Sequence, residues 1–458
     1  MTKKASRAAS TLSGGRRAFF SARGLAWEAL NRVEQRGAWA EAWLEARLPE
    51  AGLSPADARL AWELSLGTIK FKTFLDYALK PYLSKPGALP GPARTLLRLG
   101  AYQLLLLSKI PPHAAVHATV ELAKSRLSLP HVRLVNAVLR ALSRQGAPAL
   151  PDPKDDPAAH AAVRYSLPLF LAERWLARFG PVQAAAMFEA ANEAPPLAAR
   201  VNLGAATREQ ALAGLAAAGV QAEPGLLPES LLLQREGRPA QWPGLAEGWL
   251  YFQDQASQLV GRLADPQPGQ VCLDLCSAPG GKATHLAELL KGTGQVLAYD
   301  SHPQRLQRVE ENARRLRLEN LRTLSDLPPE VRADRVLVDA PCSGLGTLRR
   351  HAEARWRVQA GDFARMAAGQ LALLDQAAGF VKPGGHLVYS TCTTEPEENE
   401  DVVARFAETH PAFRLLAGPG SGGQPDTMFW GGDGLFRTFP GHPELDGLFA
   451  ARWVREEK

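Results

Sequence analysis

Cysteine is scarce in this chain: only four of its 458 residues are cysteine, and all lie between positions 272 and 392. Extracellular domains that depend on disulfides carry cysteine at a far higher density. Paired ligand spacings such as C-x2-C or H-x3-H with a partner pair are also missing. We therefore expect reduced thiols in a cytoplasmic protein and no metal site. The four cysteines are Cys272, Cys276, Cys342 and Cys392.

Long apolar runs are missing as well. The best candidate, around Leu97–Ile110, is interrupted by Arg98, Gly100, Gln103 and Lys109, whereas a membrane-spanning helix needs about 18 apolar residues in a row. We expect no membrane association. Hydrophobic residues make up 46% and charged residues 22% of the chain, as in ordinary globular proteins. The length suggests about three domains.

Acidic residues are absent from the first 23 positions. The basic residues there are Lys3, Lys4, Arg7, Arg16, Arg17 and Arg23. The net charge of the whole chain is +6, from 53 basic and 47 acidic residues, so this segment accounts for the excess. We expect residues 1–20 to be a flexible basic tail, and three roles stay open for it: a nucleic-acid-binding arm, an organellar transit peptide, or a solvated tail without a role. The mixed charge and the lack of heptads elsewhere favour a monomer.

Residues 21–145 show a helical pattern throughout, with apolar residues at helical spacing and no strand-like segment. Ser54-Pro55 is typical of a helix start, with a capping serine before a proline at the first helical position. We expect an all-α domain of six or seven helices. Residues 146–160 contain four prolines and three aspartates, which neither continue a helix nor form a core, and we expect a linker there.

The remaining chain divides into two parts. Residues 161–250 are expected to form a small α+β module, with a helix at about 160–192 and two short strands on either side of a further helix. In residues 251–458, short apolar runs alternate with amphipathic helices, a pattern typical of parallel βαβ units in a doubly wound α/β domain. Its expected strands are Val271–Leu275, Gln295–Tyr299, Arg335–Val338 and His386–Tyr389, with Leu448–Val454 as a final edge strand.

A glycine turn follows the first of these strands, in the sequence Cys-Ser-Ala-Pro-Gly-Gly-Lys at 276–282. In a doubly wound fold a ligand lies at this point, beyond the strand and at the helix N-terminus. The turn does not match the P-loop G-x4-G-K-[ST], which disfavours a nucleoside triphosphate. Asp300 ends the next strand, 26 residues after Asp274, where such folds place an acid that binds a ribose. Asp326 follows a further expected strand between Tyr299 and Arg335 and could reach a base or an amine.

Two cysteines follow other strands of the same expected sheet. Asp339-Ala-Pro-Cys342 comes after one strand and Cys392 after another, so both thiols are expected in the crevice beside the glycine turn. A thiolate there suggests covalent attack on an electrophilic carbon. A cysteine hydrolase is disfavoured, because the one histidine close after Cys342 is His351, which lies in the basic segment 349–351.

These motifs closely resemble those of the Sun/RsmB family of rRNA cytosine-C5 methyltransferases. The resemblance rests on Leu-Asp-Leu-Cys-Ser-Ala-Pro-Gly-Gly-Lys at 273–282, Asp-Ala-Pro-Cys-Ser-Gly-Leu-Gly at 339–346, Arg-Arg-His at 349–351, and Tyr-Ser-Thr-Cys at 389–392 followed by Glu397-Glu398-Asn399.

The resemblance extends to the helical region, where Pro-Pro-His-Ala-Ala-Val at 111–116 and Val-Asn-Ala-Val-Leu-Arg at 135–140 are similar to the NusB-like RNA-binding domain of the family. It covers about residues 21–456. The fold it implies is a NusB-like all-α domain, a small α+β module and a Rossmann-like class I methyltransferase domain.

The resemblance implies S-adenosylmethionine as the cofactor. It would lie against the glycine turn, with Asp300 on the ribose and Asp326 near the adenine. The implied cofactor-binding residues are Cys276, Ser277, Ala278, Pro279, Gly280, Gly281, Lys282, Asp300, Asp326 and Asp339.

The catalytic roles are also implied by the resemblance. Cys392 would be the nucleophile that adds to C6 of cytosine, Cys342 would act in product release, and Asp339 would hold the edge of the base, as a protonated acid hydrogen-bonded to N3. In DNA cytosine methyltransferases the Pro-Cys cysteine is itself the nucleophile, so an exchange of the two roles stays open. Lys282 either acts near the base or satisfies an acidic neighbour.

The expected substrate is RNA. Arg349, Arg350 and His351 are expected to contact phosphate, with a solvated charged loop as the alternative. The function that the motifs imply is S-adenosylmethionine-dependent methylation of cytosine C5 in 16S rRNA through a covalent cysteine–C6 adduct, with 16S rRNA or a small-subunit precursor as the partner. The alternatives are the same chemistry on tRNA or 23S rRNA, and a non-catalytic RNA-binding ribosome-assembly factor.

Overall fold

The computed structural model describes residues 21–234, 242–419, 427–442 and 444–457. The expected basic tail at 1–20 lies outside the described residues. The chain forms two compact units, residues 1–188 and residues 189–458. No helix among the described residues is long and apolar enough to cross a membrane. The described residues also include no cluster of three or more His, Cys, Asp or Glu side chains fit to hold a metal ion.

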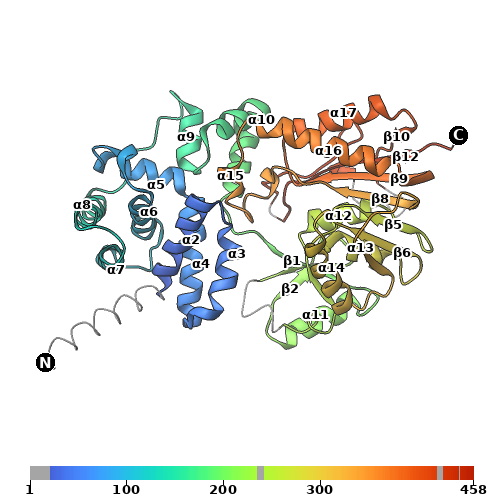
Figure 1. The fold of residues 1–458 in the computed structure, drawn as a ribbon, viewed down its shortest axis with the longest axis horizontal. Helices are drawn as coiled ribbons and strands as arrows, with labels where there is room; N and C mark the ends of the chain where they lie inside the picture. The colour runs from blue at the N-terminus through green and yellow to red at the C-terminus, as the bar shows by residue number, and fades with distance from the viewer. Residues whose placement is uncertain (1–20, 235–241, 420–426, 443, 458) are drawn as a thin grey trace. The chain divides into compact units, whose positions relative to one another are not determined.

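The first unit begins with a bundle of helices (Figure 1). Its α-helices are α2 (Ala22–Arg36), α3 (Ala40–Arg47), α4 (Pro55–Lys70), α5 (Lys72–Leu79), α6 (Gly91–Leu106), α7 (Pro112–Lys124) and α8 (Leu129–Gln145). Short 3-10 turns lie at η1 (Pro49–Ala51), η2 (Lys80–Tyr82) and η3 (Pro86–Ala88). Seven α-helices between residues 22 and 145 confirm the expected all-α domain of six or seven helices.

The start of helix α4 has the capping that the sequence predicts. The Ser54 side chain accepts a hydrogen bond from the Asp57 backbone N–H at 3.1 Å, and Pro55 is the first residue of α4. The one arginine inside the apolar run of α6 is also explained. Arg98 is buried and binds both oxygens of Asp76, with Nε to Oδ1 at 2.6 Å and a second bond at 2.7 Å, and it also contacts Glu34. Its charge is therefore compensated inside the bundle.

The segment expected as a linker runs along the first unit. The hydroxyls of Tyr82 and Tyr77 donate hydrogen bonds to the backbone oxygens of Gly146 and Ala149, at 2.7 and 2.6 Å. Helices α9 (Pro157–Arg164) and α10 (Leu169–Ala190) follow, and the Ser166 side chain accepts a hydrogen bond from the Thr73 backbone at 2.9 Å. The first compact unit therefore extends to residue 188, further than the boundary that prolines alone indicate at 146–160.

The second unit opens with a small antiparallel sheet in the order β2-β3-β1-β4. Its elements are β1 (Leu197–Val201), α11 (Arg208–Ala217), β2 (Ala222–Pro224), β3 (Ser230–Leu233) and β4 (Leu250–Phe252). The two strands expected from the sequence are β1 and β3, and they pair directly with each other. The α+β character is confirmed, with two more strands than the sequence indicated.

A larger sheet forms the rest of this unit, in the order β10-β12-β9-β8-β5-β6-β7, with β11 paired to β12. Its strands are β5 (Val271–Asp274), β6 (Gln295–Tyr299), β7 (Leu321–Leu324), β8 (Ala333–Asp339), β9 (Val381–Thr391), β10 (Phe413–Leu415), β11 (Phe436–Arg437) and β12 (Phe449–Arg455). Strands β5 to β9 are parallel, as expected. The prediction of a final edge strand is wrong in its position, because β10 adds outside β12 and makes β12 an inner, antiparallel strand.

Helices cover both faces of the large sheet (Figure 1). The covering helices are α12 (Gln255–Leu263), α13 (Gly281–Leu289), α14 (Pro303–Arg315), α16 (Asp362–Ala378) and α17 (Glu400–Thr409). The short helix α15 (Ala354–Arg357) and the 3-10 turns η5 (Leu345–Thr347), η6 (Pro396–Glu398) and η7 (Thr427–Phe429) lie in the connecting segments. One buried core lies under α12, α13 and α14, and the other under α16 and α17. This arrangement confirms the doubly wound domain, whose parallel strands end at a common edge.

Candidate active site

The glycine turn connects β5 to α13. Its backbone is pinned to the neighbouring strand β6, because the Ser277 backbone N–H and hydroxyl both donate to the backbone oxygen of Tyr299, at 2.9 and 3.0 Å. Gly280 ends the turn with φ at +107°, a conformation that side chains rarely adopt. A Cβ there would also lie 3.2 Å from the Cα of Val309. The second glycine of the pair, Gly281, is the first residue of α13.

Carboxylates follow neighbouring strands at this edge. Asp300, after β6, is buried, and its Oδ1 accepts a hydrogen bond from the His302 backbone at 2.9 Å. Asp274, the last residue of β5, is buried as well, and its Oδ2 has no hydrogen-bond partner among the described residues. Burial and the nearby charge of Asp339 raise the pKa of Asp274 to about 7. Asp326 instead lies exposed beyond β7, where its Oδ2 accepts a hydrogen bond from the Ser325 hydroxyl at 3.4 Å.

Lys282 and Asp339 form an ion pair inside this edge. The Lys282 Nζ donates to Asp339 Oδ2 at 2.6 Å, and the Ser390 hydroxyl donates to Asp339 Oδ1 at 2.8 Å. Burial opposes the charge on Lys282, but Asp339 outweighs it and raises the pKa of Lys282. The acidic neighbour that the sequence left open for Lys282 is therefore Asp339. Both oxygens of Asp339 accept hydrogen bonds, as those of an ionised carboxylate do.

The two cysteines expected in the crevice lie against each other. Their Sγ atoms are 3.4 Å apart, and the Cys392 backbone N–H points at Cys342 Sγ at 3.3 Å. A hydrogen bond from the Cys342 thiol, aided by Lys282, lowers the pKa of Cys392 although burial opposes it. The same hydrogen bond and burial raise the pKa of Cys342 well above its usual range. Cys392 is therefore the more acidic thiol of the pair, and a proton shared between the two sulfurs is favoured on Cys342.

The other two cysteines have different surroundings. Cys272 is fully buried within β5, and burial raises its pKa to about 12. Cys276 lies in the glycine turn, where burial and the charge of Asp274 raise its pKa to about 12. Neither thiol is activated as a nucleophile, because the thiolate is the reactive form.

Arg349 and Arg350, which are expected to contact RNA phosphate, form ion pairs within the protein. Arg349 is buried, and its Nε donates to Asp446 Oδ1 at 2.5 Å. Arg350 binds the other oxygen of Asp446 and also Asp254, the latter at 2.7 Å. Both guanidinium groups are thus engaged within the protein, since a buried carboxylate needs a cationic partner. His351, the third residue of the motif, lies at the surface.

Sequence reasoning did not assign several of these residues to the site. Asp446, which pairs with both arginines, lies almost 100 positions after them, and only the fold reveals the contact. Asp274 entered the sequence reasoning only as the position from which Asp300 is counted, although its place just before a glycine turn was a signal. Glu398, part of a recognised motif, contacts the segment around Cys342.

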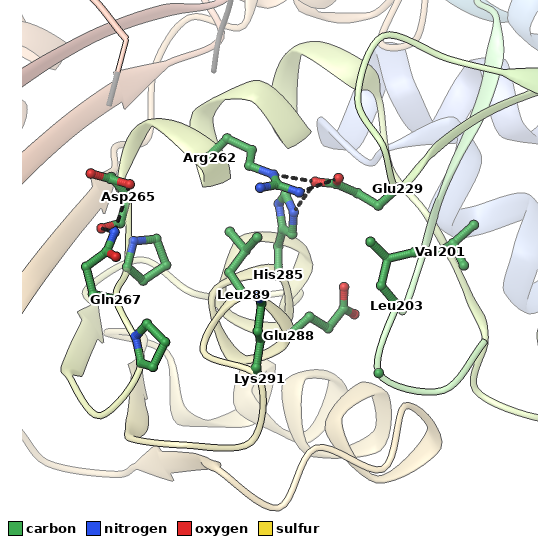
Figure 2. A pocket seen from close by; sticks show the side chains of 13 residues that line it. Val201, Leu203, Glu229, Arg262, Asp265, Gln267, His285, Glu288, Leu289 and Lys291 are labelled. Carbon is green, nitrogen blue, oxygen red and sulfur yellow. Dashed lines mark hydrogen bonds and ion pairs between the residues drawn. The ribbon is translucent and has the colours of Figure 1, made fainter. Parts of the chain in front are cut away.

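A separate cavity lies at the other end of α13, near its C-terminus (Figure 2). Its volume is about 660 Å³. Glu229 binds Arg262 at 2.6 Å and His285 at 3.0 Å beside this cavity. Its lining residues are Val201, Leu203, Gly204, Glu229, Arg262, Asp265, Pro266, Gln267, Pro268, His285, Glu288, Leu289 and Lys291. None of the site residues predicted from the sequence lines it, so it is distinct from the cysteine site.

Three family models match successive parts of the chain. Residues 21–144 match the NusB family, residues 167–239 match the ferredoxin-like domain of RsmF/B-like methyltransferases, and residues 262–454 match the 16S rRNA methyltransferase RsmB/F. The N-terminal bundle is thus NusB-like, the small antiparallel sheet is part of a ferredoxin-like module, and the large sheet forms the methyltransferase domain.

Whole proteins show the same relationship. The chain is 37% identical to the probable ribosomal RNA small subunit methyltransferase B of Bacillus subtilis, over 86% of this chain and 89% of that protein. It is 35% identical to the corresponding protein of Synechocystis, over 94% and 98%. The crystal structure of a methyltransferase homologue from Pyrococcus horikoshii superposes with a TM-score of 0.56 and 28% identity, over 66% of this chain and 99% of that one. The chain therefore belongs to the RsmB/F family of rRNA small-subunit methyltransferases.

Proposed function

We propose that this protein is an S-adenosylmethionine-dependent methyltransferase that methylates C5 of cytosine in 16S rRNA through a covalent adduct between Cys392 and C6 of the base. The observation that carries the proposal is the pair of cysteine sulfurs 3.4 Å apart beside the Lys282–Asp339 ion pair. A thiolate, a thiol, an ammonium and a carboxylate gathered at the edge of a doubly wound sheet are the groups that this reaction requires.

The residues at the glycine turn fit S-adenosylmethionine. The left-handed Gly280 lets the backbone turn closely, and buried Asp300 follows the neighbouring strand, where a ribose diol would bind. Asp274 adds a buried oxygen without a partner at the same edge. The bound cofactor supplies an electrophilic methyl group. The turn residues 276–282 would hold it, and exposed Asp326 would bind its adenine.

The two cysteines have different roles in the reaction: Cys392 attacks the base, and Cys342 acts in its release. Cytosine C5 is a poor nucleophile, so the Cys392 thiolate first forms an S–C6 bond, and the electrons of the C5–C6 double bond move to C5 while N3 accepts a proton. The Lys282–Asp339 pair holds the edge of the base and a proton beside it. After methylation a base removes the C5 proton, N3 returns the proton that it accepted to the Lys282–Asp339 pair, the C5–C6 double bond re-forms, and the thiolate of Cys392 leaves. Cys342, within contact of Cys392, acts in this release.

The RNA must present an unstacked base, because the target atom has to reach Cys392. We infer that the NusB-like bundle binds the rRNA substrate, as 16S rRNA or a small-subunit precursor, and that the protein acts in the cytoplasm as a monomer. With Arg349 and Arg350 engaged in ion pairs, other residues supply the contacts to phosphate. We propose the basic segment 1–20 as one source of these contacts.

The test is transfer of a labelled methyl group from S-adenosylmethionine to unmodified 16S rRNA. We expect Cys392→Ala to abolish both transfer and adduct, and Cys342→Ala to accumulate a protein–RNA adduct on denaturing gels. Cys272→Ala, which removes a thiol from inside a strand, is the matched control and should retain transfer. The reverse pattern of adducts would exchange the roles of the two cysteines.

Two other outcomes decide between the alternatives. Transfer to tRNA or 23S rRNA but not to 16S rRNA would keep the chemistry and change the substrate. Binding of RNA without transfer to any of them would favour a non-catalytic assembly factor. The activated thiolate argues against that factor, because RNA binding alone requires no nucleophile.

A further inference from the structure

Glu398 is a fully buried carboxylate that the proposed reaction leaves without a role. It ends the 3-10 turn η6, directly before α17. Its Oε2 accepts hydrogen bonds from the Ser343 backbone N–H at 2.8 Å and from Gln370 Nε2 at 3.1 Å. A buried carboxylate is costly to keep, so it needs a compensating role.

These hydrogen bonds bracket Cys342. Ser343, the residue after Cys342, is bound by Glu398 itself, and Pro341, the residue before it, offers its backbone oxygen to the same Gln370 Nε2 at 3.0 Å. The Glu398–Gln370 pair therefore holds the peptide groups on both sides of Cys342. It sets the position of the Cys342 sulfur relative to its neighbours.

The same network reaches the strand that carries Cys392. The Ser343 hydroxyl bonds to the hydroxyl of Thr393, the residue after Cys392, at 2.7 Å. The Tyr389 hydroxyl, three residues before Cys392, donates to the backbone oxygen of Glu398 at 2.6 Å. Both cysteines are thus fixed against one another by groups that meet at Glu398.

The charged groups around the two sulfurs differ. Cys342 faces Glu398 and the hydroxyl of Tyr389, besides Cys392. Cys392 faces Lys282 and Asp339, and the Thr347 hydroxyl. Within the described residues Glu398 has no cationic partner in any ion pair, and burial raises its pKa. A carboxylate behind Cys342 favours a proton on that sulfur, whereas at Cys392 the charges of Asp339 and Lys282 act in opposite directions.

We propose that Glu398 is a positioning residue which, with Gln370, fixes Cys342 against Cys392 and keeps the proton of the pair on Cys342, leaving the thiolate on Cys392. The importance of Glu398 for catalysis rests on the proposed function, in which Cys392 attacks the base. The arrangement itself is a property of the protein alone, so it is testable without RNA or cofactor.

The experiment measures alkylation of each cysteine by iodoacetamide in the full-length protein, site by site by mass spectrometry, from about pH 6 to about pH 10, because only the thiolate reacts. In the wild type we expect Cys392 to react first at neutral pH. In Glu398→Gln, which keeps the shape and an acceptor for Ser343 but removes the charge, the rate at Cys342 near pH 7 should rise about tenfold and its pH profile should move to lower pH.

Two variants separate charge from packing. Glu398→Asp keeps the charge, so the preference for Cys392 should stay close to that of the wild type. Asp401→Asn removes an exposed carboxylate from the first turn of α17 and should change neither profile. If Glu398→Asp and Glu398→Gln lost the preferential alkylation of Cys392 to the same extent, Glu398 would act through packing alone. That result would overturn the proposal.

The alkylation measurement on the wild-type protein tests the proposal without relying on the folding of any variant. Alkylation of Cys342 before Cys392 at neutral pH would overturn the proposal directly. Failure of the proposed function looks different, because the alkylation pattern would then be as expected while no methyl group reached any RNA.

Discussion

Arg200 and Glu288 join the small antiparallel sheet to the helix that follows the glycine turn. The guanidinium of Arg200, in β1, binds both oxygens of Glu288 in α13, with Nε to Oε2 at 2.7 Å and Nη2 to Oε1 at 2.9 Å. It also binds the backbone oxygen of Gly281 at 2.9 Å and the Thr284 hydroxyl at 3.0 Å. The ferredoxin-like module therefore holds the first turn of α13, directly beside the expected cofactor position.

Replacing Arg200 tests this connection. Arg200→Met should lower the free energy of unfolding by about 3–5 kcal/mol, because it leaves Glu288 buried without its partner. It should also weaken S-adenosylmethionine binding, since the helix start is no longer held. Denaturant titration and calorimetric titration of the cofactor measure the two effects. Arg208→Met, at a partly exposed ion pair of 3.8 Å, is the control and should cost less than about 0.5 kcal/mol.

The role of Arg350 is open to a test that separates stability from RNA binding. Arg350→Met should lower the free energy of unfolding by about 2–4 kcal/mol, because it removes a cation that Asp446 and Asp254 share. A phosphate contact would instead reduce the slope of log affinity against log salt by about 1. Filter binding of 16S rRNA at several salt concentrations gives that slope. We expect it to be unchanged, and a reduced slope with unchanged stability would restore the RNA contact. The exposed Arg405→Met serves as the stability control.

Gly346 sits where the two cysteine segments meet. Its backbone N–H donates to the Cys392 oxygen at 2.9 Å, and its own oxygen accepts from the Gly447 N–H at 2.8 Å. A Cβ here would overlap the Gly447 oxygen and approach the Cys392 oxygen to 3.0 Å. Gly346→Ala should therefore reduce methyl transfer by about a hundredfold or more, since even about 1 Å of misplacement carries such a cost. Gly361→Ala, where a Cβ meets nothing within 4 Å, should leave transfer intact.

Acid should destabilise the protein through His285. Burial, joined by the charge of Arg200, lowers the pKa of His285 to about 4, against about 6.5 in an unfolded chain. Between these values the unfolded chain binds a proton that the folded protein does not, so the free energy of unfolding falls as the pH drops from about 6.5 to about 4, by up to about 3 kcal/mol.

Urea titrations at several pH values measure this loss. His285→Gln, which can still donate to Glu229, should show a shallower fall with pH than the wild type. His302→Gln removes an exposed histidine and should leave the slope unchanged. Equal slopes in the wild type and His285→Gln would contradict the account.

Much of the site could be predicted because it depends on local pattern. The glycine turn, Asp300, Asp339, Cys342 and Cys392 each follow a strand that the alternation of apolar runs and helices already indicated. Parallel strands end at one edge, so residues far apart in sequence were expected together, and the two sulfurs lie 3.4 Å apart. The roles implied for these residues stay predictions until transfer is measured.

The partners of the arginine motif and the position of the last strand could not be predicted from the sequence. Arg349-Arg350 has the composition of a phosphate-binding segment, and only folding brings Asp446 and Asp254 against it. The position of β12 depended on whether β10 would pair outside it, which no pattern within either strand decides. By itself the sequence determined the elements and the residues at their ends, because these depend on neighbours along the chain. The tertiary structure alone decided which charges are paired, which of the two cysteines is the more acidic and which strand lies at the edge, because these depend on groups that only packing brings together.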